Sequence, residues 1–288
     1  HLANELAEES GIDPEWIQSG MLIFDTEEKH QAIEWSKRFK VAMEILPGEA
    51  IQNGEPLISP LGEDALWFPD MAQIRPPRLM KALRKSLQRR GVRILEGIEV
   101  HAIRIEKDRV TGIETDRDYY EAESVVIAGG AWSGRLLESM GLKTSVEPVR
   151  GQIILYKAKP GWLSRMVQYQ RHYLIPRRDG RILAGSTIEY AGFDKKTTKE
   201  GLQGLHQCAS EMMPKLQECR IEHRWAGLRP GKKDGIPIVG AHPAIEGLYI
   251  HTGHFRNGVI LSPASAALLV NIMKNEIPIL DHKPYMPR

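Results

Sequence analysis

The strongest constraint on the fold lies near the C-terminal end, where an apolar strand, a glycine-bounded loop and an apolar helix follow one another. Leu248–His251 has the pattern of a short buried strand, Gly253–Gly258 forms the loop, and Val259–Met273 forms the helix. Both loop glycines are expected to be free to take positive φ. A helix that begins after such a loop directs its unpaired N–H groups and the positive end of its dipole toward the space in front of its N-terminus. The stretch predicts a site for an anion, although an ordinary helix start beside a solvated loop also fits it.

Composition excludes several classes of function. The 288 residues suffice for two domains, and 39 basic against 37 acidic side chains give no sign of a nucleic-acid or anionic membrane partner. Cys208 and Cys219 have no CxxC spacing and indicate a reducing, cytoplasmic compartment. No apolar run reaches the roughly 18 residues of a membrane span, because Ser262 and Pro263 interrupt the best one.

A second strand and turn lie in the middle of the chain. Ser124–Ser133 is an apolar run with a glycine pair, which predicts a buried parallel strand, a tight turn and a helix over Ser133–Met140. The small residues would let a ligand approach the backbone closely. An ordinary strand-to-helix turn is the alternative.

Between Val149 and Thr187 the sequence has several short strands close together. Strands at Val149–Tyr156, Arg171–Pro176 and Arg181–Thr187 lie close together in sequence and predict an antiparallel sheet, followed by a helix over Thr198–Met213. Earlier in the chain, a helix from Pro76 to about Arg90 and a strand at Val92–Leu95 are expected. The apolar residues of that helix, expected to face inward, are Leu79, Met80, Leu83 and Leu87.

This alternation of parallel units and antiparallel blocks indicates an α/β (α+β) fold with two interleaved domains. An incomplete Rossmann-like domain would hold a dinucleotide and comprise residues 1–19, 72–145 and 226–288. An antiparallel-sheet domain would cover the substrate and comprise residues 20–71 and 146–225.

Several motifs carry a family resemblance. Leu228-Arg-Pro-Gly with Asp234-Gly, followed by Gly253-His-Phe-Arg-Asn-Gly-Val-Ile-Leu-Ser-Pro, resembles the flavin-dependent glycine oxidases of the D-amino-acid oxidase superfamily, a branch associated with thiamine synthesis. Val126-Ile-Ala-Gly-Gly-Ala-Trp-Ser resembles the superfamily's second adenine-nucleotide motif, and Pro148-Val-Arg-Gly-Gln resembles its return into the substrate domain. The resemblance covers the chain from His1 to its end.

The resemblance implies non-covalent FAD, since neither cysteine falls in a flavin-facing motif. Main-chain groups would meet the adenine at Val100 and His101, and the adenosine and pyrophosphate near Ala128, Gly129 and Trp132. The final loop would lie at the flavin ring, where its backbone N–H groups stabilise negative charge. The loop residues implied are His254, Arg256, Asn257, Gly258 and Val259.

Three residues are the candidate catalytic residues. An arginine offers a planar, always-charged donor pair that suits a carboxylate, and Arg229 matches the family's carboxylate-binding arginine. Tyr173 matches the tyrosine that assists the same carboxylate, and Arg256 would close the loop near the ring. A surface ion pair for Arg229 and a half-buried core position for Tyr173 are the alternatives. Ile188 replaces the family's pocket methionine, and its apolar side chain keeps the pocket small and dry.

The implied reaction is the oxidative deamination of glycine and small D-amino or N-methyl amino acids by FAD and molecular oxygen. The products would be a 2-oxo acid, ammonia or an amine, and hydrogen peroxide. A D-amino-acid dehydrogenase that passes electrons to a quinone, and a non-catalytic binding module, are the alternatives.

One element of the family pattern is missing from the sequence. The family's first strand, GxGxxG turn and helix do not occur, so the 288-residue chain alone is expected to bind FAD weakly or not at all and to be inactive, with that unit upstream. No metal site is predicted, because His206 and His223 have no partners at ligand spacing. A homo-oligomer is compatible with the sequence.

Overall fold

The computed structural model describes residues 1–24, 29–140 and 144–287, and it divides into two compact units. Helices combined with parallel and antiparallel strands confirm the predicted α/β (α+β) class. Contacts alone define these units, so the assignment of residues to an FAD-binding and a substrate domain stays a prediction. Unit 1 comprises His1–Ile94, Gln152–Thr187 and Lys196–Ala226, and unit 2 comprises Leu95–Gly151, Ile188–Lys195 and Gly227–Arg288.

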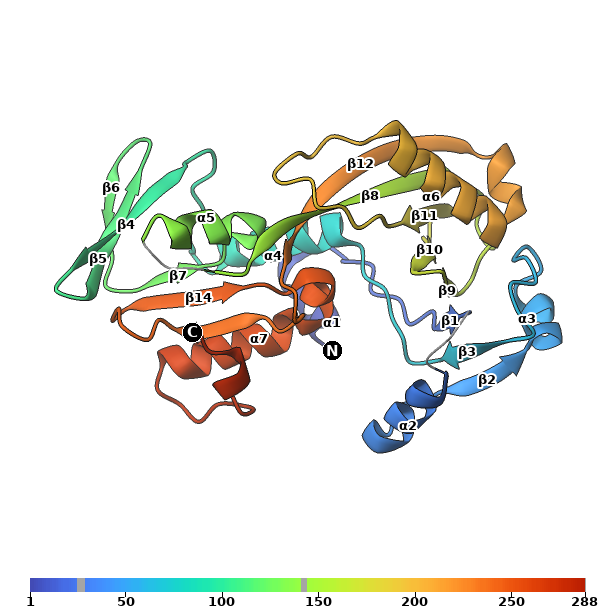
Figure 1. Cartoon of the computed structure of the whole chain (residues 1–288), viewed down its shortest axis with the longest axis horizontal. Coiled ribbons are helices and arrows are strands. Elements are labelled where there is room, and N and C mark those ends of the chain that lie inside the picture. The colour runs from blue at the N-terminus through green and yellow to red at the C-terminus, as the bar shows by residue number, and fades with distance from the viewer. Residues whose placement is uncertain (25–28, 141–143, 288) are drawn as a thin grey trace. The chain divides into compact units, whose positions relative to one another are not determined.

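The largest sheet has the strand order β12-β8-β11-β10-β9-β1-β3-β2 (Figure 1). The neighbours β8, β11, β10 and β9 pair antiparallel, as their close spacing in the sequence predicts, whereas β1 runs parallel to β9. The strands are β1 Met21–Ile23, β2 Glu44–Pro47, β3 Asp64–Phe68, β8 Glu147–Lys157, β9 Met166–Tyr169, β10 His172–Pro176, β11 Arg181–Gly185 and β12 Arg220–Gly231. Short elements beside them are α2 Lys29–Phe39, α3 Gly48–Gly54 and η2 Pro214–Glu218.

The helix predicted at Thr198–Met213 is α6, Lys199–Met212, and it packs on this sheet. Thr198 is its N-cap, and the Thr198 hydroxyl accepts a hydrogen bond from the Gly201 N–H at 3.2 Å. Leu205 and Met212 are fully buried in the same core as the strand residues Ile154 and Leu174. The predicted helix is therefore confirmed to within one residue at each end.

The prediction for the earlier helix was right in position and wrong in orientation. It is α4, Pro76–Arg89, but Met80, Leu83 and Leu87 are 63%, 39% and 40% exposed. The helix instead packs against α1, Leu2–Ser10, with the small Ser86 near Glu9. A helical period identifies an apolar face, but only the neighbouring elements decide what covers it. The strand expected at Val92–Leu95 is likewise not formed, and these residues are largely exposed.

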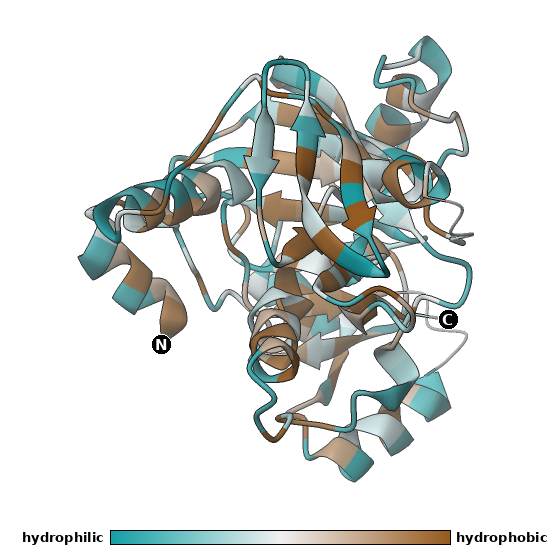
Figure 2. Cartoon of the chain, turned by 90° about the vertical axis from the view of Figure 1, so that its left-hand side faces the viewer, coloured by the Kyte–Doolittle hydropathy of each residue, from teal (hydrophilic) through white to brown (hydrophobic). Residues whose placement is uncertain are grey.

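Unit 2 contains two three-stranded sheets, β13-β14-β7 and β4-β5-β6. β14 runs parallel to β7 and antiparallel to β13. In the view of Figure 2 hydrophobic residues gather in the strands, and a hydrophilic hairpin turn lies at the top. The elements are β4 Val100–Glu106, β5 Arg109–Thr115, β6 Tyr119–Glu121, β7 Val125–Ile127, η1 Gly130–Trp132, α5 Ser133–Glu138, β13 Ile238–Ala241, β14 Leu248–Thr252, η3 Phe255–Asn257, α7 Gly258–Met273 and η4 Lys283–Tyr285.

The strand predicted within Ser124–Ser133 is β7, and its parallel pairing is confirmed. It is less buried than expected, because β7 is an edge strand among the described residues and Val126 is 38% exposed. The helix after it, α5, ends at Glu138, two residues before the predicted Met140.

The C-terminal strand, loop and helix form as predicted, with one difference in the loop. Gly253 takes φ +79, but Gly258 has a helical φ of −55 and is the first residue of α7, while Phe255 takes φ +46. The expectation that no apolar stretch is long enough for a membrane span was wrong, because Phe255–Met273 passes this test by length and composition, and 17% of it is buried. In this structure Leu268 and Leu269 of α7 pack against Val239 of β13.

Candidate functional site

The carboxyl ends of β7 and β14 lie at the same edge of their sheet, because the two strands are parallel neighbours. The loops that follow them are joined by a hydrogen bond of 3.1 Å from the Thr252 hydroxyl to the Gly130 carbonyl. Gly130 takes φ +56, and a Cβ built there would meet nothing within 4 Å. Such an edge is where open α/β sheets bind ligands, and the turn leaves its backbone open to close approach.

The start of α7 supplies the donors of this edge. Its N-cap residue, Asn257, makes no capping hydrogen bond with its side chain, although the Asn257 N–H donates to the His254 carbonyl at 3.0 Å. The helix begins at Gly258, and a Cβ added there would contact only the His254 Cβ, at 3.6 Å. The first-turn N–H groups and the dipole of a 16-residue helix can therefore face a negatively charged group.

The His254 side chain takes a different place from the one that its loop position suggested. It is only 8% exposed, and its Nε2 lies 3.1 Å from the Ser265 hydroxyl, which also lies 3.0 Å from His251 Nε2. The two imidazole rings lie 4.7 Å apart. Burial and the neighbouring His251 lower the pKa of His254 to about 4, so the ring is neutral at pH 7. His254 thus ties the loop to α7, and any direct role toward a cofactor stays a prediction.

Sequence reasoning missed the two partners of His254. His251 lies three residues before it in β14, and Ser265 lies in the third turn of α7. The only signal in the sequence was the short spacing of the histidines, which also fits a pair on opposite faces of a strand.

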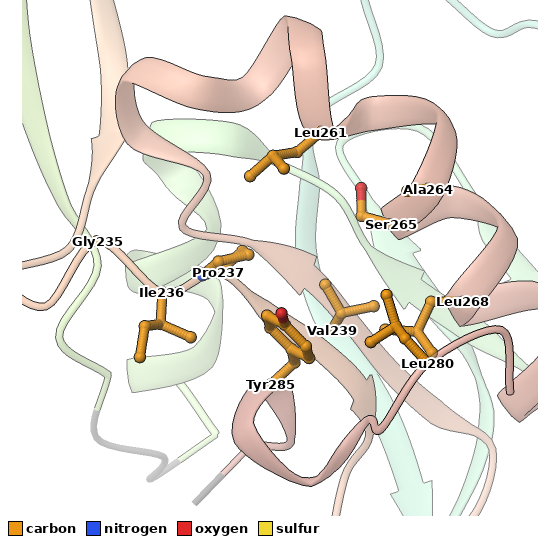
Figure 3. A pocket seen from close by; sticks show the side chains of 10 residues that line it. All are labelled: Gly235, Ile236, Pro237, Val239, Leu261, Ala264, Ser265, Leu268, Leu280 and Tyr285. Atoms are coloured by element: carbon orange, nitrogen blue, oxygen red, sulfur yellow. The ribbon is translucent and has the colours of Figure 1, made fainter. Parts of the chain in front are cut away.

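Ser265 also borders an apolar pocket of about 260 Å³ between α7 and β13 (Figure 3). Its hydroxyl and that of Tyr285 are the polar side-chain groups among the lining residues. None of its lining residues is charged. The remaining lining residues are Gly235, Ile236, Pro237, Val239, Leu261, Ala264, Leu268 and Leu280.

Arg229 lies in the unit 2 part of β12 and is held against Gly151 of β8. A Cβ built on Gly151 would lie 2.2 Å from both Nη1 and Nη2 of Arg229 and 2.4 Å from its Cζ. The end of the guanidinium thus occupies the space that a side chain at position 151 would take, and only a glycine leaves room for it. Gly151 is a second residue that sequence reasoning did not select, although it stands inside the Pro148–Gln152 motif.

The other candidate residues are dispersed. Tyr173 lies in unit 1, in β10, where its ring covers Gly185 of β11. Val100 and His101 are exposed at the start of β4. Trp132 lies in η1 with its ring centroid 5.7 Å from that of Phe193.

The structure therefore joins two of the predicted groups within unit 2: the Ala128–Trp132 turn and the His254–Val259 loop, linked through Thr252 and Gly130. The roles of these residues toward a ligand stay predictions. Open glycine backbone and helix N–H donors fit the polar, negatively charged parts of FAD. Among the described residues no group of three His, Cys, Asp or Glu side chains is arranged to hold a metal ion.

Comparison with known proteins adds independent evidence. A family model described as FAD dependent oxidoreductase matches residues 1–272. A glycine oxidase of Pseudomonas aeruginosa is 40% identical over 99% of this chain and 79% of that protein. The crystal structure of glycine oxidase from Geobacillus kaustophilus superposes with a TM-score of 0.94 at 29% identity, covering 100% of this chain and 79% of that one. An L-proline dehydrogenase from P. horikoshii gives a TM-score of 0.89 at 25% identity, covering 99% of this chain and 79% of that one.

Proposed function

Since the chain belongs to the family of FAD-dependent oxidoreductases, we propose that it oxidises glycine and small D-amino or N-methyl amino acids. The products are a 2-oxo acid, ammonia or an amine, and hydrogen peroxide when oxygen is the acceptor. The observation that carries this proposal is the Arg229 guanidinium held close to Gly151, since a fixed planar donor pair suits the carboxylate that every amino acid presents. The glycine oxidase relatives support the small size of the substrate.

The roles of the chain's own residues follow from what the reaction needs. FAD, when bound, accepts the hydrogen of the substrate α-carbon with its electron pair, so the protein must place that carbon and stabilise the resulting charge. Arg229 binds the carboxylate, and Ile188, which belongs to the same unit, excludes water. Tyr173 keeps the assisting role that the resemblance implies. Backbone N–H groups at Gly258 and Val259 stabilise negative charge in front of α7, whereas the Asn257 N–H, assigned the same role from the resemblance, donates to the His254 carbonyl.

The adenosine side of FAD is assigned to a separate set of residues. The adenosine side would use Val100, His101 and the Ala128–Trp132 turn, with Arg256 near the ring. We expect non-covalent and weak FAD binding by the 288-residue chain and correspondingly low activity, because the sequence contains no GxGxxG turn for the pyrophosphate. Titration of the chain with FAD, followed by flavin fluorescence, measures this directly, and tight binding would contradict it.

The test of the proposed function is a peroxide assay with glycine, sarcosine and D-alanine, with the flavin absorption spectrum recorded on the same sample. It is run on the chain with saturating FAD. Peroxide formation that Arg229→Ala suppresses supports the proposal. Flavin-loaded protein that oxidises none of the three substrates, with oxygen or with a dye, overturns it.

The second candidate is a dehydrogenase that passes electrons to a quinone. The similarity to the L-proline dehydrogenase structure favours it. Substrate-dependent dye reduction without peroxide would identify this activity. For either activity we propose a cytoplasmic location, because Cys208 and Cys219 are both free thiols.

A further inference from the structure

Residues Ile188–Lys195 form a strap that belongs to unit 2, although the chain on either side of it belongs to unit 1. The strap begins beside β8, where the Arg150 N–H donates to the Glu189 carbonyl at 2.8 Å and the Glu189 N–H donates to the Arg150 carbonyl at 3.0 Å. The chain then turns at Gly192, which takes φ +57. The backbone bridge to Arg150 therefore anchors the first end of the strap.

The Arg150 side chain closes the strap into a loop. Its Nε lies 2.9 Å from a carboxylate oxygen of Glu189, and its Nη1 lies 2.9 Å from one of Asp194, near the second end of the strap. Arg150 is only 6% exposed, and its hydrogen bonds with Glu189 raise its pKa. Because carboxylates from both ends of the strap bind one buried guanidinium, Arg150 fixes the conformation of the residues between them.

Phe193 is one of the residues held in this way, and it contacts two side chains outside the strap. Its ring centroid lies 5.7 Å from that of Trp132 and 3.6 Å from Cζ of Arg135. Trp132 ends η1 and Arg135 lies in the first turn of α5, and residues three positions apart in a helical segment are neighbours on its surface. The Phe193 ring therefore makes an aromatic pair with one of them and a cation–π contact with the other.

The segment that Phe193 contacts is the glycine turn after β7. Within this turn the Trp132 N–H donates to the Gly129 carbonyl at 3.0 Å, and Gly130 takes φ +56. The hydrogen bond from the Thr252 hydroxyl to the Gly130 carbonyl holds the turn from β14, and Phe193 holds it through Trp132. Glycine residues are conformationally free, so the neighbours that contact this turn determine how well its backbone is ordered.

We propose that the strap is a clamp on the η1 turn and that Arg150 is a positioning residue for FAD binding. Arg150 closes the strap, the closed strap places Phe193, and Phe193 fixes the turn that meets the adenosine and pyrophosphate. The inference rests on the proposed function, in which the Ala128–Trp132 turn approaches FAD. Arg150 and Phe193 act through Trp132 and not by contact with FAD.

The test measures two quantities in the wild type, Arg150→Met and Phe193→Leu. The first is the rate of hydrogen exchange over residues 129–135 without FAD, and the second is the Kd for FAD, followed by flavin fluorescence. Phe193→Leu should accelerate the exchange and raise the Kd, each by about twofold to tenfold, the fold-change that corresponds to the loss of an aromatic pair. Arg150→Met should change both quantities in the same direction. Because the exchange is measured without FAD, it detects the clamp even where FAD binding is weak.

The matched control is Tyr190→Leu, because Tyr190 is an aromatic residue of the same strap but is 70% exposed. Its exchange rate and Kd should equal those of the wild type. Wild-type exchange in both Arg150→Met and Phe193→Leu overturns the clamp, and faster exchange with an unchanged Kd for FAD overturns its role in FAD binding. Phe193→Leu keeps the test decisive if Arg150→Met fails to fold, because leucine retains an apolar side chain in the half-buried position. The proposed function is judged separately, by whether Arg229→Ala weakens the binding of acetate, a simple carboxylate, so the two failures are distinguishable.

Discussion

Replacement of Gly151 by alanine tests the carboxylate site without touching a charged residue. The new Cβ would lie 2.2 Å from both terminal nitrogens of Arg229, and ordinary van der Waals contact begins near 3.4 Å. The guanidinium must therefore withdraw by about 1 Å. Because the obstructing atoms are the far end of a flexible side chain, the substitution should cost little free energy of unfolding. It should nevertheless displace the guanidinium from the position in which it binds a carboxylate.

A displacement of about 1 Å at a positioning group can cost up to about a hundredfold in rate. We therefore expect Gly151→Ala to raise KM for glycine by about tenfold to a hundredfold, while the unfolding midpoint and FAD affinity remain close to those of the wild type. Steady-state kinetics on FAD-loaded protein, acetate titration and thermal unfolding measure the three quantities.

Gly227→Ala is the control, because Gly227 lies in the same strand as Arg229 and a Cβ there would meet nothing within 4 Å. It should behave as the wild type in all three measurements. Wild-type KM and acetate affinity in Gly151→Ala would refute the assignment of the Arg229 guanidinium to the substrate carboxylate.

Three further predictions follow from the site. Arg229→Ala should remove a charge-assisted contact of about 2 to 4 kcal/mol and raise the Kd for acetate by roughly 30-fold or more, with FAD binding retained. Gly258→Val should weaken FAD binding in fluorescence titrations, because the valine side chain would fill space in front of α7. The unfolding midpoint should change little, because a Cβ at Gly258 meets only the His254 Cβ. The lowered pKa of His251 and His254 should make the free energy of unfolding fall as pH decreases from about 6.5 to about 4, since the unfolded histidines take up protons first, and His254→Gln should flatten this decline in urea titrations.

Each prediction has an outcome that contradicts it. Equal acetate affinity in Arg229→Ala would point to another carboxylate partner, and unchanged FAD affinity in Gly258→Val would place the ring away from α7. Parallel pH profiles for the wild type and His254→Gln would mean that this histidine is not held neutral by the fold.

The sequence predicted elements well where the local pattern and the packing agree. The cap of α6 at Thr198 and the glycine turn before α7 are local signals, and both elements formed within a residue or two of prediction. The orientation of α4 was wrong, because the apolar period does not say which neighbour covers a face, and in the described structure α1 meets the side with small residues. Val92–Leu95 has strand composition but no partner strand in the described part of the chain.

The site was predictable in part. The glycine loops and Arg229 could be chosen from residue type and motif, because each depends on nearby backbone geometry. The contacts of His254 with Ser265 and of Arg150 with Glu189 and Asp194 join residues 11 to 44 positions apart, and no local pattern encodes such separations.

The interleaving of the two units has a consequence for how the protein folds as it is synthesised. Unit 1 contains the first residue and is complete only when Ala226 has been made, and unit 2 needs the last segment of the chain. Neither can form its full core early and wait for the other, so incomplete chains expose unpaired strands for most of translation. A need for chaperones is therefore expected in cells that make this protein, and neither unit can be produced by a single cut in the gene.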